Sequence, residues 1–167
     1  MLTPFDTLSP KARIWIYQAD RKITASEEQT ILSEAEKFIG EWAAHGQALL
    51  ASAAVFHSHF LVIATDENFN LASGCSIDSS FRFVQQLGSE MNIDFFQRTN
   101  IAFSINDEVT LIPMSKIKQE VAAGRLQSEN LFFDNNISDK SELAEKWLVK
   151  ADKSWLKRYF QTSPSVL

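Results

Sequence analysis

The chain has 167 residues, of which 45% are apolar and 11% aromatic, and its formal net charge is −5. This much apolar material predicts one folded domain and excludes a disordered chain. The acidic charge, with no basic stripe, argues against nucleic acid as a partner, and no apolar run is long enough for a membrane helix.

Cysteine use and the start of the chain indicate the compartment. Cys75 is the only cysteine, so no disulfide can form within the chain. Residues 1–15 lack a basic start followed by an apolar run, so they do not read as a signal peptide. We therefore expect a soluble, cytoplasmic protein.

The first quarter of the chain predicts a strand and then a helix. Residues 1–11 contain two prolines and are expected to form an irregular lead-in. Residues 13–18, RIWIYQ, place apolar side chains on both faces of a strand, which predicts a strand covered on both sides. Thr24 to Glu27 has the form of a capping box, so a helix should follow to about Ala44, with Gly46 as its stop.

The middle of the chain predicts two strands and a second helix. Residues 49–56 and 60–65 are strand candidates joined by a turn at 57–59, and the second is apolar throughout, as in a central strand. After a polar connection, Ser76 or Asp78 is expected to cap a helix. Its predicted core face comprises Ile77, Phe81, Val84, Leu87 and Met91.

The last third predicts a hairpin and helices. Residues 101–105 and 109–112 should pair around the turn-forming Asn106-Asp107. Ser115 is expected to cap a short helix that ends at Gly124. Residues 143–147 and 152–160 are expected to be helical, so that 140–160 form a helical C-terminal tail docked on the domain.

Together these elements predict an α+β fold over residues 1–167. We expect a single domain with a mixed or antiparallel sheet and helices packed against it.

Several well-known chemical motifs are absent. No glycine pair has the spacing of a P-loop or of a dinucleotide-binding loop, so the chain is not a P-loop ATPase. His57 and His59 would begin a metal site only if they lay on one continuous strand; a turn is the simpler interpretation, and no third ligand is evident. We therefore predict no metal and no cofactor.

The segment 66–80, DENFNLASGCSIDSS, is the most unusual stretch. Gly74 to Ser76 is expected just ahead of a helix, where free backbone N–H groups favour negative charge. This predicts a ligand site formed by Asp66, Gly74, Ser76, Asp78, Ser79 and Ser80. A thiol there also favours its thiolate form, so Cys75 could act as a nucleophile with His45 as its base. The simpler interpretation is that Cys75 fills a small buried space while Ser76 and Asp78 cap the helix.

Two further regions could bind a partner. Gln18 and Arg21 follow the first strand, where ligands often bind in open sheets, although an ordinary exposed loop is the simpler interpretation. The tail mixes aromatic and basic residues, which suits either docking on its own domain or binding another subunit or protein.

Three stretches resemble a known family. They are RIWIYQADRKIT (13–24), WAAHGQALLAS (42–52) and, most specifically, ASGCSIDSSFRFVQQL (72–87). They resemble short bacterial proteins that are often called ABC transporter ATPases, and the similarity covers nearly the whole chain. The resemblance implies a bacterial, cytoplasmic, single-domain protein and implies no catalytic residues.

The sequence leaves three functional hypotheses. The first is a non-enzymatic binding or adaptor protein with a protein partner or a homodimeric state. The second is a small enzyme that uses Cys75 and His45. The third is a small-molecule binder that holds an anion at the 74–80 helix start.

Overall fold

The computed structural model describes residues 1–161, which divide into two compact units, each with its own core. Unit 1 comprises Met1–Gln97 and Asn136–Leu143. Unit 2 comprises Arg98–Asn135 and the described chain from Ala144 onward. The short helix α4 (Glu142–Glu145) contains the point where the chain passes back from unit 1 to unit 2.

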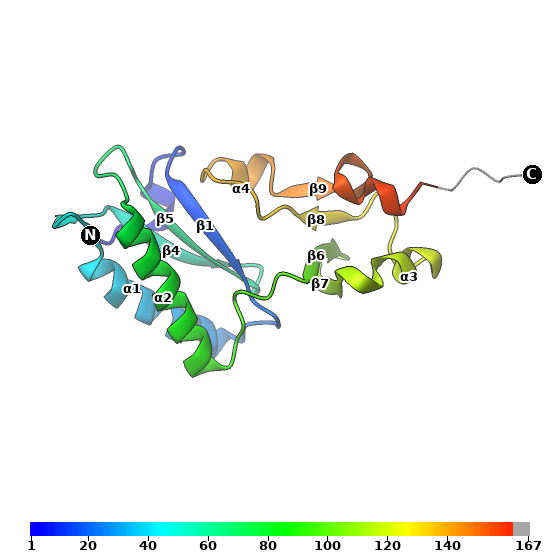
Figure 1. Ribbon diagram of the computed structural model, residues 1–167, viewed down its shortest axis with the longest axis horizontal. Coiled ribbons are helices and arrows are strands. Elements are labelled where there is room, and N and C mark those ends of the chain that lie inside the picture. The colour runs from blue at the N-terminus through cyan, green and yellow to red at the C-terminus, as the bar shows by residue number, and fades with distance from the viewer. Residues whose placement is uncertain (162–167) are drawn as a thin grey trace, which may run out of the picture. The chain divides into compact units, whose positions relative to one another are not determined.

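Unit 1 is a three-stranded antiparallel sheet with two long helices packed side by side (Figure 1). Strand β5 is central, and both of its neighbours run antiparallel to it, in the order β1-β5-β4. The helices and strands of unit 1 are the 3₁₀ helix η1 (Phe5–Thr7), β1 (Arg13–Gln18), α1 (Ala25–Glu41), β2 (Ala43–Ala44), β3 (Gln47–Ala48), β4 (Ala51–Phe56), β5 (Phe60–Thr65) and α2 (Gly74–Met91).

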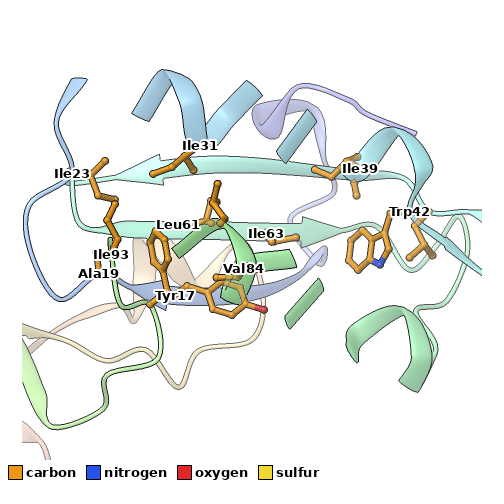
Figure 2. Close-up of a cluster of buried hydrophobic side chains, with 14 of the residues drawn as sticks. Tyr17, Ala19, Ile23, Ile31, Ile39, Trp42, Leu61, Ile63, Val84 and Ile93 are labelled. Atoms are coloured by element: carbon orange, nitrogen blue, oxygen red, sulfur yellow. The ribbon is translucent and has the colours of Figure 1, made fainter. Parts of the chain in front are cut away.

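The main core lies between this sheet and its helices (Figure 2). Leu61 and Ile63 of β5 are fully buried against Ile31 and Ile39 of α1 and Val84 of α2. Each such side chain stabilises the fold by roughly 1.5–3 kcal/mol relative to an exposed position. Every second residue of β5 faces this core, and the α1 residues in it recur with helical spacing.

The opposite sheet face has its own apolar cover. Ile14, Val62 and Ala64 pack there with Leu8 and Ala12 from the chain ahead of β1. The predictions that β1 is covered on both sides and that β5 is central are therefore confirmed.

Unit 2 is a four-stranded antiparallel sheet in the order β7-β6-β8-β9. Its core contains Phe103, Ile117, Phe132 and Leu156. Its elements, with α4 described above, are β6 (Asn100–Ile105), β7 (Glu108–Pro113), η2 (Met114–Lys116), α3 (Ile117–Ala122), β8 (Leu131–Phe133), β9 (Leu148–Lys150), η3 (Ala151–Lys153) and η4 (Trp155–Tyr159).

Several of the predictions that rest on short sequence patterns are confirmed. The α+β class and the antiparallel pairing are observed, and the Thr24–Glu27 capping box is formed with both of its hydrogen bonds. The predicted hairpin turns through Asn106 and Asp107, both with positive φ. That conformation suits the right-handed twist of the paired strands.

Two helix boundaries were predicted wrongly in unit 1. Helix α1 ends at Glu41 rather than near Ala44, and Gly46 lies in the turn of an unpredicted hairpin, β2-β3. Helix α2 begins at Gly74, with Ser73 as its N-cap, rather than at Ser76 or Asp78. Ser76 occupies the N3 position of this capping box, where Glu or Gln is usual, so the sequence pattern did not reveal that the helix starts at Gly74.

The earlier start changes the inward face of α2. Its buried residues are Ser76, Ser80, Val84, Leu87 and Gly88. The predicted Phe81 and Met91 are only partly buried against the core, and Ile77 is half-exposed. Small residues face inward because α2 lies close to the sheet and to its own following segment.

The prediction of a helical tail over residues 140–160 is wrong, because this segment consists mostly of 3₁₀ turns. Ser154 has an extended backbone between η3 and η4, and its hydroxyl bonds both Ala151 O and Leu156 N. Such a side chain competes with helical hydrogen bonds and divides the segment. Strands β8 and β9 were not predicted, and Ser115 does not cap α3, whose N-cap is Lys116.

Candidate functional site

Cys75 is an exposed thiol in the first turn of α2, one residue after the helix begins. The prediction placed it just ahead of the helix, and its burial in an apolar space is not observed. The first turn is closed by the Ser73–Ser76 capping box: Ser76 N donates to Ser73 Oγ at 3.1 Å, and Ser73 N donates to Ser76 Oγ at 2.7 Å.

The serine hydroxyls of this helix start already have acceptors within the helix. Ser76 Oγ donates to Ser73 O, Ser79 Oγ to Ser76 O and Ser80 Oγ to Ile77 O, at 2.7–2.8 Å. Ser76 and Ser80 are also buried. A ligand at this end would therefore meet mainly Gly74, Cys75 and Asp78, which are exposed.

His45 lies in the tight turn between β2 and β3, exposed and with a φ of 51°. This hairpin lies near the start of α2 because Trp42, the residue after α1, donates from Nε1 to Ser76 O at 2.8 Å. Among residues 1–161, no hydrogen bond joins Cys75 to an imidazole. Asp66 also belongs to this end, and its carboxylate accepts from Asn68 N within its own turn.

Gln18 and Arg21 lie at the opposite end of unit 1. Arg21 contacts the last residues of α2, donating to Met91 O at 3.1 Å and Asn92 O at 3.3 Å. Helix α2 has 18 residues, so its ends are about 27 Å apart. The structure therefore separates the predicted ligand residues into two groups, one at each end of α2, which cannot contact one small ligand together.

The turn that contains His57 and His59 does not place both rings on one strand. His57 and Ser58 both have positive φ, and His59 Nδ1 bonds the His57 carbonyl at 3.0 Å. Burial lowers the pKa of His57, and the neighbouring His59 adds to this effect. Within residues 1–161, no three His, Cys, Asp or Glu side chains are grouped to hold a metal ion.

Two exposed apolar side chains beside the Cys75 helix start were not among the residues predicted from the sequence. Leu71 is 70% exposed and Phe69 is 51% exposed, both in the loop that joins β5 to α2. The sequence does contain a signal for this surface, because Phe69 and Leu71 are large apolar residues within an otherwise polar loop. We call residues 66–75, which include Phe69 and Leu71, the Leu71 surface.

A shallow groove of about 490 Å³ lies at the other end of α2. Asp20, Ser89, Asn92 and Asp94 line it together with the half-buried Phe96. Asp20 and Asp94 are joined across it, since Asp94 N donates to Asp20 Oδ1 at 2.9 Å and Asp20 N donates to Asp94 O at 3.0 Å. The Asp20 carboxylate and the Asp94 backbone therefore join the end of β1 to the segment after α2.

Comparisons with known proteins leave the resemblance without support. The chain matches no protein-family model, no curated protein and no solved structure. The similarity to proteins called ABC transporter ATPases therefore stays a prediction. No helix within residues 1–161 has the length and apolar character needed to cross a bilayer.

Proposed function

We propose that this chain is a non-enzymatic binding or adaptor protein that contacts a partner protein through the Leu71 surface. The observation that carries the proposal is the exposure of Leu71 and Phe69, at 70% and 51%. Large apolar side chains grouped in one exposed loop favour a protein contact, because burying them removes apolar area from water.

The surroundings of this surface support binding more than catalysis. The serine hydroxyls behind it donate to backbone carbonyls, and the thiol has no hydrogen-bonded base within the described residues. A nucleophilic enzyme needs its base within hydrogen-bond reach of the nucleophile, or of an intervening water.

The single cysteine provides a direct test. A photo-crosslinker attached to Cys75 in the full-length protein should capture one discrete partner from extract of the source cell. The Phe69→Ser/Leu71→Ser variant carrying the same label should lose that product. The matched control carries the label on α1 instead, in Cys75→Ser/Gln29→Cys, and should not capture the partner. Equal products from both label positions would contradict the proposal.

The second candidate function is a cysteine-dependent enzyme, and the exposure of Cys75 in the first turn of an 18-residue helix favours it. It requires Cys75 to react with an alkylating reagent faster than a free thiol at about pH 6. It also requires His45→Asn to slow that reaction if His45 is the base. A rate equal to that of a small thiol, unchanged by His45→Asn, would exclude this candidate.

A further inference from the structure

A second groove, of about 270 Å³, lies between α1 and α2, which run side by side in Figure 1. Phe38, Phe83 and Leu87 contribute apolar side chains to it, and Glu34, Glu41 and Glu90 contribute carboxylates. Phe38 and Phe83 stack with their ring centroids 4.6 Å apart and their planes within 5°. The groove therefore combines aromatic surface with negative charge.

The charge of this groove is only partly compensated within the described chain. Lys37 pairs with Glu34, with Nζ 2.6 Å from Oε1. Glu41 and Glu90 have no cationic partner in the described part of the chain. Both lie in the last turn of their helices, where the helix dipole is already negative, and neither last turn contains a basic residue. Because the end of α1 contacts the start of α2, the helices run antiparallel and Glu41 and Glu90 lie toward opposite ends of the groove. Two cations, one near each carboxylate, would relieve this unfavourable arrangement.

One segment of the same chain has the complementary chemistry. Residues 153–159, KSWLKRY, carry three cations and no acid in a chain whose net charge is −5. Lys153 and Lys157 are exposed, and Trp155 is 43% exposed. The Arg158 guanidinium lies over the Trp155 ring, 5.6 Å from its centroid. This cationic aromatic segment matches an acidic aromatic groove in both charge and apolar character.

We propose that the α1–α2 groove of one molecule binds the 153–159 segment of a second copy of this chain. A volume of about 270 Å³ lies below the usual range for small-molecule pockets, roughly 300–1,000 Å³, and suits one large side chain such as Trp155. A two-fold dimer would use the contact twice. The groove shares no lining residue with the Leu71 surface, and this proposal does not depend on the proposed function.

Self-association of the full-length protein is the first readout. Light scattering should show the mass rising from monomer to dimer as protein concentration increases, and added salt should oppose this because the contact is electrostatic and partly exposed. A protein that is monomeric at every concentration, at low salt, would overturn the proposal.

Charge reversal on each side identifies the two surfaces. Lys153→Glu/Lys157→Glu and Glu41→Lys/Glu90→Lys should each weaken dimerisation by roughly tenfold or more, because attraction becomes repulsion. The control, Lys22→Glu/Lys118→Glu, changes net charge as the first pair does but at exposed lysines elsewhere, and should dimerise like the wild type.

An equimolar mixture of the two charge-reversed variants supplies the decisive measurement. At a concentration where the wild type dimerises, each variant alone should be mostly monomeric. The mixture should recover the dimer because an acidic segment then meets a basic groove and a basic segment meets an acidic groove. Recovery also shows that both variants are folded. Failure to recover, with both variants giving wild-type circular dichroism spectra, would refute the contact.

Discussion

Arg21 and Glu27 form a two-point ion pair, with Nη1 2.9 Å from Oε2 and Nη2 2.8 Å from Oε1. Arg21 also donates to the carbonyls of Lys22, Met91 and Asn92, so all five of its N–H groups are engaged. Glu27 meanwhile accepts from Thr24 N as part of the α1 capping box. One guanidinium thereby joins the start of α1 to the end of α2.

This ion pair predicts a pH dependence of stability. The Arg21 hydrogen bonds lower the pKa of Glu27 from 4.5 to about 2. The carboxylate therefore stabilises the fold above its ordinary pKa, and this contribution is lost as the pH falls from about 4.5 toward 2. We expect Glu27→Gln to be less stable at neutral pH and to lose less stability than the wild type over that range.

Urea unfolding at several pH values measures this effect. Glu28→Gln is the matched control, because Glu28 has no ion pair within the described residues, and it should follow the wild-type pH profile. Parallel profiles for Glu27→Gln and the wild type would show that the ion pair does not contribute.

A second prediction concerns the buried hydroxyl of Tyr17. The residue is 4% exposed, and its hydroxyl has no hydrogen-bond partner within residues 1–161. Burial raises the pKa of Tyr17 to about 12. The nearby Ser80 hydroxyl gives its proton to Ile77 O and so does not donate to Tyr17. We expect Tyr17→Phe to stabilise the protein by about 1 kcal/mol, because it removes an unpaired polar group from the core.

Thermal and urea unfolding give the sign directly. Tyr159→Phe is the matched control, since the Tyr159 hydroxyl accepts from Arg158 Nη2 at 3.1 Å, and it should be neutral or slightly destabilising. Destabilisation by Tyr17→Phe would mean that the hydroxyl has a partner, such as a buried water.

A third prediction uses two helical glycines in opposite surroundings. A Cβ on Gly88 would collide with the Ile93 carbonyl oxygen, where the chain turns back against α2. Gly88→Ala should therefore cost about 1–3 kcal/mol, as overpacking does. Gly40→Ala in α1 has open space and should stabilise by up to about 1 kcal/mol. Urea unfolding of both variants tests this, and equal effects would refute the packing argument.

A fourth prediction concerns cooperativity between the two units. The sequence predicts a single domain, which should unfold in one transition detected alike by every probe. Trp15 and Trp42 lie in unit 1, and Trp147 and Trp155 lie in unit 2. Retaining tryptophan in only one unit, with Phe in the other, makes fluorescence report on that unit. In each variant, the urea unfolding curve followed by fluorescence should superimpose on the curve followed by circular dichroism, which reports on the whole chain. Different midpoints for the two probes would instead establish two domains.

The sequence alone determined those features that depend on neighbouring residues. The Thr24–Glu27 capping box, the apolar run of β5 and the Asn106-Asp107 turn each arise from local hydrogen bonding, side-chain alternation or backbone preference. These interactions form between residues a few positions apart, so their pattern is visible in the chain itself.

Only the tertiary structure decided how distant segments meet. The order β1-β5-β4, the pairing of β8 with β9 and the contact of Arg21 with Met91 join residues far apart in sequence. The same applies to the candidate ligand residues, which the length of α2 separates into two groups, and to the exposure of Cys75 and Leu71. Burial depends on which surfaces the whole chain covers, and that is a property of packing rather than of local pattern.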